Sequence, residues 1–142
     1  MKLLKKQLSS RRMMPWIIGL GAVCFFVLLP FFRPGFFVTD DGDWMIIRLS
    51  AFTHALRDGQ FPTRFLGRLN NNYGYPVANF LYPGFLYIGS FIHAIGVPYV
   101  ETIKLILGGS VLVGTLAIFF WLRTQFALLP SFLGATGYLL AP

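Results

Sequence analysis

Charge and cysteine are both scarce in this chain of 142 residues. Charged side chains make up 12% of the sequence, against roughly 25% in ordinary globular proteins, and only five of them are acidic. The one cysteine, Cys24, excludes an intrachain disulfide and leaves the redox compartment open. Apolar residues reach 56% and aromatic residues 18%. This composition excludes an ordinary soluble domain and indicates a membrane protein, provided that long apolar segments carry the excess.

The first such segment is residues 13–32, which hold no charge over 20 positions. That is about the length needed to cross a ~30 Å hydrocarbon core. A basic segment with no acid precedes it, in which the cations are Lys2, Lys5, Lys6, Arg11 and Arg12. Cations of this kind stay in the cytoplasm, so 1–12 are predicted to be a cytoplasmic tail, 13–32 a transmembrane helix and 33–99 an external loop.

Two other interpretations of this basic start fit less well. A signal peptide would need a shorter apolar run and a small-x-small cleavage site, and "FFRPGFFVTD" offers none. The net charge of +7 would suit nucleic-acid binding, but the aromatic residues lie in apolar runs and not on a basic face. We therefore expect no nucleic-acid partner.

A second uncharged run covers 105–122, and with the residues before it gives a predicted transmembrane helix over 100–122. Ser110 and Gly114 in it form a small-xxx-small spacing that lets a neighbouring helix approach. The last segment, 126–142, begins a further span and stops without a flank. We therefore expect the chain to be the N-terminal fragment of a longer polytopic helical bundle.

Two shorter helices are predicted within the external loop. Over 44–58, apolar residues recur at Met45, Leu49, Phe52 and Leu56, which gives an amphipathic helix on the outer membrane surface or against the spans. Gly59 is expected to end it as the C′ residue. Residues 79–96 are apolar but contain two tyrosines and fall short of a comfortable span. They are predicted to form a surface-lying or re-entrant helix, with a short true span as the alternative. Residues 60–78, between the two helices, are predicted to form an ordered loop.

The stretch "TDDGDW" places Asp40, Asp41 and Asp43 just before the first of these helices. One aspartate, Asp43, is expected to cap that helix, an interaction typically worth ~1 kcal/mol. A calcium loop of the EF-hand type is excluded, since its twelfth position would fall on alanine, phenylalanine or histidine and not on glutamate. A general base or a divalent-metal ligand remains open for the others, with Asp43 as the metal candidate.

Four further side chains are candidates for binding. His54 and Arg57 lie on the polar side of the predicted helix 44–58, either as a solvated face or as part of a cleft shared with the aspartates. Arg64 is a further cation in the external loop. Lys104 is expected to pair with Glu101 at i, i+3, and a lipid phosphate is the alternative partner for its ammonium group.

The order of these segments resembles the N-terminal part of bacterial membrane proteins of the GT-C glycosyltransferase superfamily. The nearest subgroup is the membrane family labelled "6-pyruvoyl-tetrahydropterin synthase-related", a label that we do not take to mean pterin chemistry. The resemblance covers 14–142, and its most specific parts are "ALRDGQFP" (55–62), "YGYPVANFLYPG" (73–84) and the region of Lys104.

This resemblance implies a multi-pass protein of the bacterial inner membrane whose first external loop carries an acidic residue. That acid acts as a base, or helps to bind a divalent metal, while a sugar moves from a polyprenyl-phosphate donor to an acceptor. Asp40 and Asp41 hold the matching position, and membrane lipid and a lipid-linked sugar are the implied partners. The family often has a histidine a few residues later, where this chain has Asp43 and Trp44, so the choice of catalytic carboxylate and the use of metal stay open.

A non-catalytic membrane protein, such as a transporter or an envelope-assembly subunit, is the alternative of another class. Its aspartates would be caps or ion gates. Transport predicts charges within the spans, and 14–32 and 105–122 have none, which weighs against it. We expect enzymatic activity only in a longer chain, because 142 residues are too few to enclose a lipid-sugar site.

Overall fold

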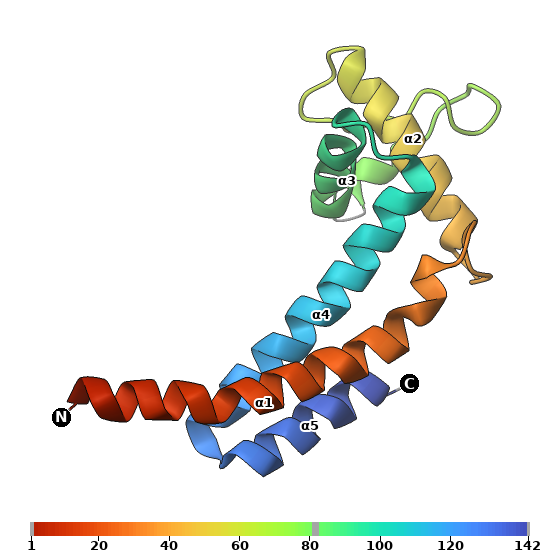
Figure 1. Cartoon of the computed structure of the whole chain (residues 1–142). Coiled ribbons are helices and arrows are strands. Elements are labelled where there is room, and N and C mark those ends of the chain that lie inside the picture. The colour runs from red at the N-terminus through yellow and green to blue at the C-terminus, as the bar shows by residue number, and fades with distance from the viewer. Residues whose placement is uncertain (1, 81–82, 142) are drawn as a thin grey trace. The chain divides into compact units, whose positions relative to one another are not determined.

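The computed structural model describes residues 2–80 and 83–141, and of residues 2–12 only the backbone (Figure 1). The described residues form α1 (Lys2–Leu28), η1 (Leu29–Phe32), α2 (Gly42–Arg57), η2 (Val77–Asn79), α3 (Gly84–Ala94), α4 (Tyr99–Gln125) and α5 (Leu128–Leu140). No strand occurs among them; the extended pairing there is a single bridge between Leu66 and Tyr75. The predicted all-α class is confirmed for this part of the chain.

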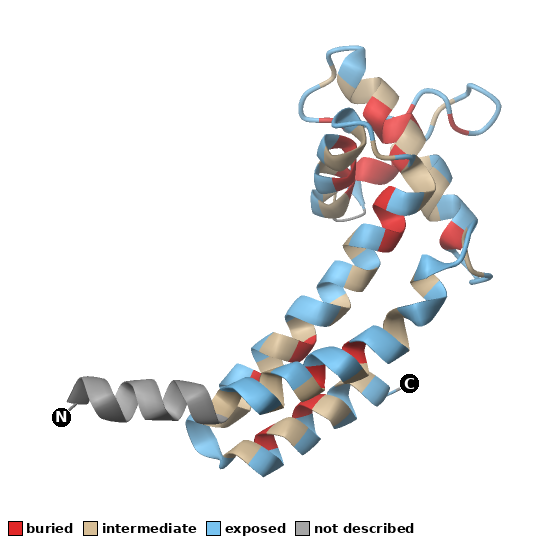
Figure 2. Cartoon of the chain, viewed as in Figure 1, coloured by how far each residue is buried: buried red, intermediate tan, exposed pale blue. Residues whose placement is uncertain are grey.

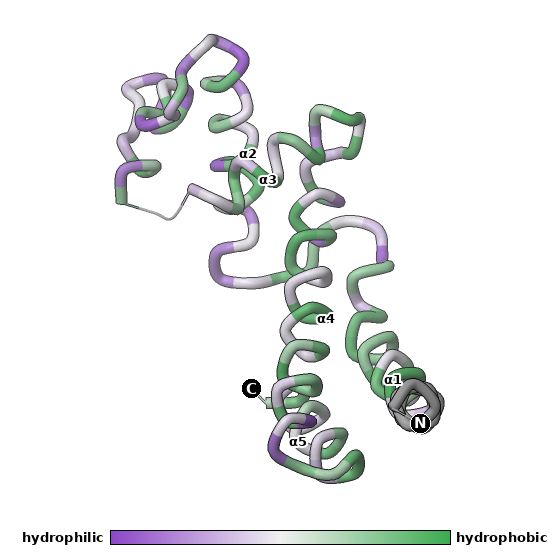
Figure 3. The backbone as a smooth tube through the Cα atoms, turned by 90° about the vertical axis from the view of Figure 1, so that its left-hand side faces the viewer, coloured by the Kyte–Doolittle hydropathy of each residue, from purple (hydrophilic) through white to green (hydrophobic). Residues whose placement is uncertain are grey.

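Two segments in the described part are long and apolar enough to cross a membrane. They are Met13–Phe32 and Tyr99–Gln125, and hydrophobic residues run along both α1 and α4 in Figure 3. Only 11% of each apolar window is buried. A core helix of a soluble protein would be mostly buried, so this exposed apolar surface favours membrane association.

The chain divides into two compact units. The terminal unit comprises residues 1–33 and 108–142, and the central unit comprises residues 34–107. Helix α4 is continuous through the boundary, so its first nine residues belong to the central unit and the rest to the terminal unit. Each unit has its own hydrophobic cluster.

The terminal unit is held together by the packing of α5 on α1 and α4. Leu20, Phe119 and Ala135 are fully buried at its centre. A Cβ added at Gly114 would lie 3.0 Å from the hydroxyl oxygen of Tyr138, so the absence of a side chain there allows α5 to approach α4. The close helix contact predicted at Gly114 is thus present.

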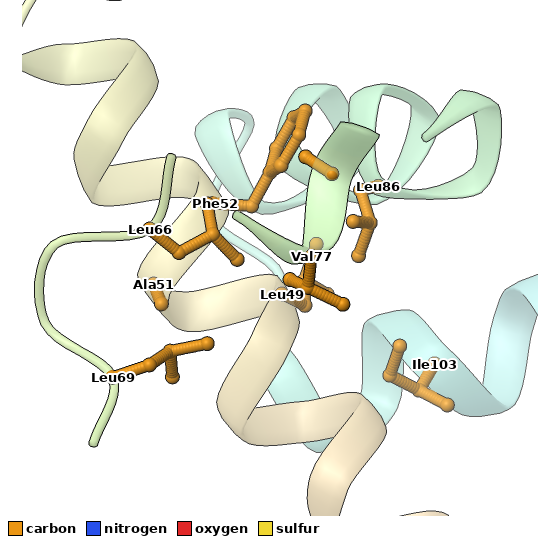
Figure 4. Packing of buried hydrophobic residues seen from close by; sticks show 9 residues of the cluster. Leu49, Ala51, Phe52, Leu66, Leu69, Val77, Leu86 and Ile103 are labelled. Carbon is orange, nitrogen blue, oxygen red and sulfur yellow. The ribbon is translucent and has the colours of Figure 1, made fainter. Parts of the chain in front are cut away.

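The central unit has a larger core, built by α2, α3, the start of α4 and the segment 66–78 (Figures 2 and 4). Its buried residues are Leu49, Ala51, Phe52, Leu66, Leu69, Val77, Ala78, Leu86 and Ile103. The predicted apolar stripe of α2 faces this core: Leu49 and Phe52 are fully buried, while Met45 and Leu56 pack against it. The stripe was expected to face a membrane surface or the spans. It packs against protein: Ile103 at the start of α4, within the predicted span, belongs to this core, and α3 and 66–78 supply the rest of the apolar surface.

The segment after α2 is an ordered loop, as predicted. Backbone hydrogen bonds join Leu66 and Tyr75 in both directions, at 2.9 and 3.1 Å, and close the loop at its base. Asn70, Asn71 and Asn72 at its tip all have φ between 51° and 70°. Asparagine is among the few non-glycine residues that visit this left-handed region readily. The three asparagines therefore permit the reversal that returns the chain to Tyr75.

The predicted helix over 79–96 is shorter in the structure. Residues 77–79 form the single turn η2, residues 81–82 lie outside the described part, and α3 covers 11 residues from Gly84. Pro83 occupies the N-cap position of α3, where its missing N–H group costs no helical hydrogen bond. A helix of this length rises about 16 Å, roughly half of a hydrocarbon core. This length favours the surface-lying or re-entrant helix over the short span, and the placement in a membrane stays a prediction.

Helix α2 ends as predicted at a glycine. Gly59 has φ +86°, its N–H donates to the carbonyl of Leu56 at 3.0 Å, and the N–H of Gln60 donates to that of Ala55 at 3.0 Å. These two bonds define a Schellman motif with Gly59 as the C′ residue. The helix itself covers 42–57, against the predicted 44–58.

Replacing Gly59 by alanine is expected to lower the free energy of unfolding by about 1 kcal/mol, because alanine is strained at this positive φ. The matched control is Gly84→Ala in α3, where a Cβ has nothing within 4 Å and no positive φ is required. That change is expected to be neutral or slightly stabilising. Thermal unfolding of both variants in detergent measures the difference, and equal melting temperatures would contradict the assignment.

Candidate functional site

The three aspartates flank the N-terminus of α2. Asp40 and Asp41 are exposed, and Asp43 lies exposed in the first turn. Asp41, not Asp43, occupies the N-cap position, and its side chain makes no capping bond, which corrects the predicted cap at Asp43. Asp43 instead lies in the first turn, where the negative charge of a carboxylate interacts favourably with the positive end of the helix dipole. None of the three carboxylates has a hydrogen-bond or ion-pair partner among the residues described. The fold does not use them as caps.

The position of this acidic segment depends on Gly42. A Cβ there would lie 2.4 Å from both the ring of Phe36 and the hydroxyl oxygen of Thr39. Phe36 in turn packs against the core of the central unit. The chain before α2 is thus folded tightly over a buried glycine, which holds the exposed Asp40 and Asp41 at the entry to the helix.

His54 and Arg57 line two different grooves of the central unit. The groove that contains His54 has a volume of about 400 Å³, and Ser50, Arg68 and Tyr99 supply its other polar side chains. We call it the Arg68 groove. The groove that contains Arg57 has about 330 Å³ and lies along α2 and α3, with Tyr87 and Phe91 in its wall. We call it the Arg57 groove. Neither is lined by an aspartate, so the structure does not bring His54, Arg57 and the three acids into one of these grooves.

Arg64 and Lys104 have contrasting surroundings. Arg64 is exposed, and its backbone N–H donates a hydrogen bond to Oε1 of Gln60 at 2.9 Å. Lys104 is buried, with 4% of its side chain exposed, and its Nζ lies 3.1 Å from Oε1 of Glu101. The predicted Glu101–Lys104 pair is confirmed. The ammonium group of Lys104 is therefore already in an ion pair, whereas the side chain of Arg64 is exposed to solvent.

Replacing Glu101 by glutamine is expected to destabilise the protein by about 1–2 kcal/mol, because it removes the negative charge that lies 3.1 Å from the buried ammonium group of Lys104. The effect stays below that of a fully buried pair since half of Glu101 is exposed. Thermal unfolding in detergent measures the loss. Adding Lys104→Met to the Glu101→Gln variant should recover part of it, and no recovery would contradict this account.

Two polar residues of the Arg68 groove were missed by sequence reasoning. Arg68 lies on the loop closed by Leu66 and Tyr75, and Tyr99 begins α4. Both lie near His54 only because the chain folds back on α2, and no sequence spacing predicts that proximity. The sole local signal was the left-handed asparagine turn, which shows that the loop reverses but not which face of α2 it meets.

The described residues hold no group of three or more histidine, cysteine, aspartate or glutamate side chains arranged to bind a metal ion. A divalent cation bound by carboxylates usually needs several oxygen ligands from the protein or its substrate. The predicted metal role of Asp43 therefore stays a prediction.

Comparison with known proteins gives no family: no family model, no curated protein and no solved structure matches this chain.

Proposed function

We propose that this chain is the N-terminal part of an integral-membrane glycosyltransferase that uses a polyprenyl-phosphate-linked sugar at the outer face of a bacterial inner membrane. The proposal includes a polytopic helical bundle with a cytoplasmic N-terminus. The observation that carries it is the acidic segment: Asp40 and Asp41 are exposed, held in place by Gly42, and bonded to no described residue. Carboxylates that stabilise nothing in the fold are available for chemistry.

The proposed chemistry is acid–base. Asp40 or Asp41 accepts the proton of an acceptor hydroxyl, while the oxygen of that hydroxyl attacks the anomeric carbon of the sugar. The bond from that carbon to the phosphate oxygen breaks, and polyprenyl phosphate leaves with the electron pair. The exposed aspartates belong to the central unit, which lies in the chain between two helices long and apolar enough to cross a membrane, and this suits a substrate that is itself anchored in lipid.

The donor phosphate requires cations, and His54, Arg57, Arg64 and Lys104 are the predicted candidates. Arg57 and Arg64 suit this role best, because both are exposed and neither has an ion-pair partner among the described residues. Lys104 is less suited, since its ammonium group is buried against Glu101. A planar guanidinium also matches two phosphate oxygens at once.

The test is a transfer assay on the full-length open reading frame. Membranes from cells that express it are incubated with radiolabelled polyprenyl-phosphate sugars, and labelled products are separated from the donor. We expect transfer of label that depends on the expressed frame. A frame that ends near residue 142, or a longer one that transfers no sugar from any donor of the panel, would instead support the non-catalytic alternative.

A further inference from the structure

We propose that α3 is the helix through which the central unit rests on the lipid bilayer, with acyl chains as the partner of its outer face. That face carries Ile88, Phe91 and Ile95, which are 57%, 71% and 70% exposed. Their spacing of i, i+3 and i+7 puts them on one side of the helix. The proposal goes beyond the proposed function, because it requires neither sugar transfer nor the three aspartates.

The opposite face of α3 is already covered by protein. Leu86, Gly89 and Ser90 are buried there. A Cβ added at Gly89 would lie 2.7 Å from Cδ1 of Leu49, so α3 packs closely on α2. A helix at the surface of a soluble domain buries one apolar face and turns a polar face to water. Helix α3 is apolar on both sides, and a contiguous apolar surface that the protein leaves exposed marks an interaction site.

The polar side chains of α3 all have partners within the central unit. The hydroxyl oxygen of Tyr87 accepts a 3.0 Å hydrogen bond from the backbone N–H of Thr63. Oγ of Ser90 lies 2.8 Å from Oγ1 of Thr53, and Nδ1 of His93 lies 2.8 Å from the carbonyl oxygen four residues later. Hydrocarbon offers no hydrogen-bond partner, so a helix in contact with it has to satisfy its polar groups within the protein. Helix α3 meets this condition with its side chains.

Lipid fits the outer face better than a protein partner does. Interfaces between proteins carry about one hydrogen bond per 100–200 Å². The exposed stripe has no polar side chain to make one, and no charged residue occurs anywhere between Arg68 and Glu101. Phe61 adds to the apolar surface, since its ring is 80% exposed and meets that of Tyr87 in α3 at 5.9 Å.

Two contacts set the level of α3 in a membrane that α4 crosses. The Cβ added at Gly89 would also lie 3.3 Å from Cδ1 of Ile106. Ile106 is the second residue of the uncharged run of α4, which begins directly after Lys104. In addition, Phe91 lines one groove together with Arg57, whose guanidinium group has to reach water or headgroups. Helix α3 therefore lies just beneath the headgroups and not deep in the hydrocarbon.

The test compares how often nitroxide side chains collide with two quenchers. In the full-length protein, Cys24 is replaced by alanine, and single cysteines are introduced as Ile88→Cys, Phe91→Cys and Ile95→Cys. Each is spin-labelled in phosphatidylcholine liposomes and exposed to oxygen, which concentrates in hydrocarbon, or to a nickel chelate, which stays in water. Asp58→Cys is the matched control, because this exposed position at the end of α2 already carries a charge.

We expect the ratio of oxygen to nickel collisions to be at least about fivefold higher at the three α3 positions than at position 58, because the polar chelate is excluded from hydrocarbon. A ratio equal to that of the control would place the stripe in water. Low collision rates with both quenchers would place it against protein, either further helices of a longer chain or a second copy. Either result overturns the proposal.

Footprinting of the unmodified protein in the same liposomes repeats the comparison without any substitution. A carbene released from a lipid-soluble probe is expected to label the peptide that contains α3, whereas hydroxyl radicals generated in water should leave Phe91 unoxidised. Mass spectrometry locates both kinds of label. Oxidation of Phe91 without carbene labelling of α3 would contradict contact with lipid.

Discussion

The double substitution Asp40→Asn/Asp41→Asn is expected to lower sugar transfer by the full-length protein about 100- to 10,000-fold, the range usual for loss of a general base. Asparagine keeps the shape of the side chain but cannot accept the proton of the acceptor hydroxyl. Because neither carboxylate bonds to a described residue, the substitutions should leave the melting temperature unchanged. Initial rates with a radiolabelled polyprenyl-phosphate sugar measure the effect.

Single substitutions then separate the candidates. One of Asp40→Asn and Asp41→Asn should account for most of the loss, and Asp43→Asn should cost much less if it serves only the helix dipole. Asp58→Asn is the matched control, since it removes an exposed carboxylate at the other end of α2. Full activity in Asp40→Asn, Asp41→Asn and Asp43→Asn, equal to that of the control, would contradict a catalytic role for these aspartates.

The largest effect on stability is expected from Phe52→Ala. Phe52 is fully buried at the centre of the central unit, and its ring meets that of Tyr87 edge to face at 4.8 Å. Deleting a buried phenylalanine costs about 3–5 kcal/mol through lost transfer energy and the cavity left behind. Since 1.4 kcal/mol is tenfold, amide protection in α2 and α3 should fall by a factor on the order of 100 or more.

Hydrogen exchange read by mass spectrometry on peptides from α2 and α3 measures this loss. Phe91→Ala is the control: it deletes the same side chain from α3 at a site that is 71% exposed, so protection should change by less than about threefold. The terminal unit has a separate cluster of its own. A loss of protection in α5 as large as that in α2 would mean that the two clusters do not unfold separately.

The parts of the fold that could be predicted were those set by local physics. Long uncharged runs mark α1 and α4, and the spacing of Leu49 and Phe52 gives the buried face of α2. Gly59 marks the end of that helix because its left-handed conformation favours glycine. The N-cap was misplaced by two residues, since three aspartates in four positions all satisfy the same capping preference.

The site was harder to predict because it depends on contacts distant in sequence. Spacing put His54 and Arg57 on one polar face of α2, yet they line separate grooves: α3 forms the other wall beside Arg57, and the loop and the start of α4 do so beside His54. Arg68 and Tyr99 join His54 only after the loop and the start of α4 have packed on α2. The Glu101–Lys104 pair could be predicted because it is local, at one helical turn.

The continuity of α4 fixes the distance between the Arg68 groove and the apolar run that follows it. The helix has 27 residues and rises about 40 Å. Its uncharged part, residues 105–122, accounts for about 27 Å of this length, close to a ~30 Å hydrocarbon core. Tyr99 is the first residue of the same helix, about 9 Å along its axis from the start of that uncharged part. In a membrane crossed by α4, we therefore expect this wall of the groove to lie at the level of the lipid headgroups.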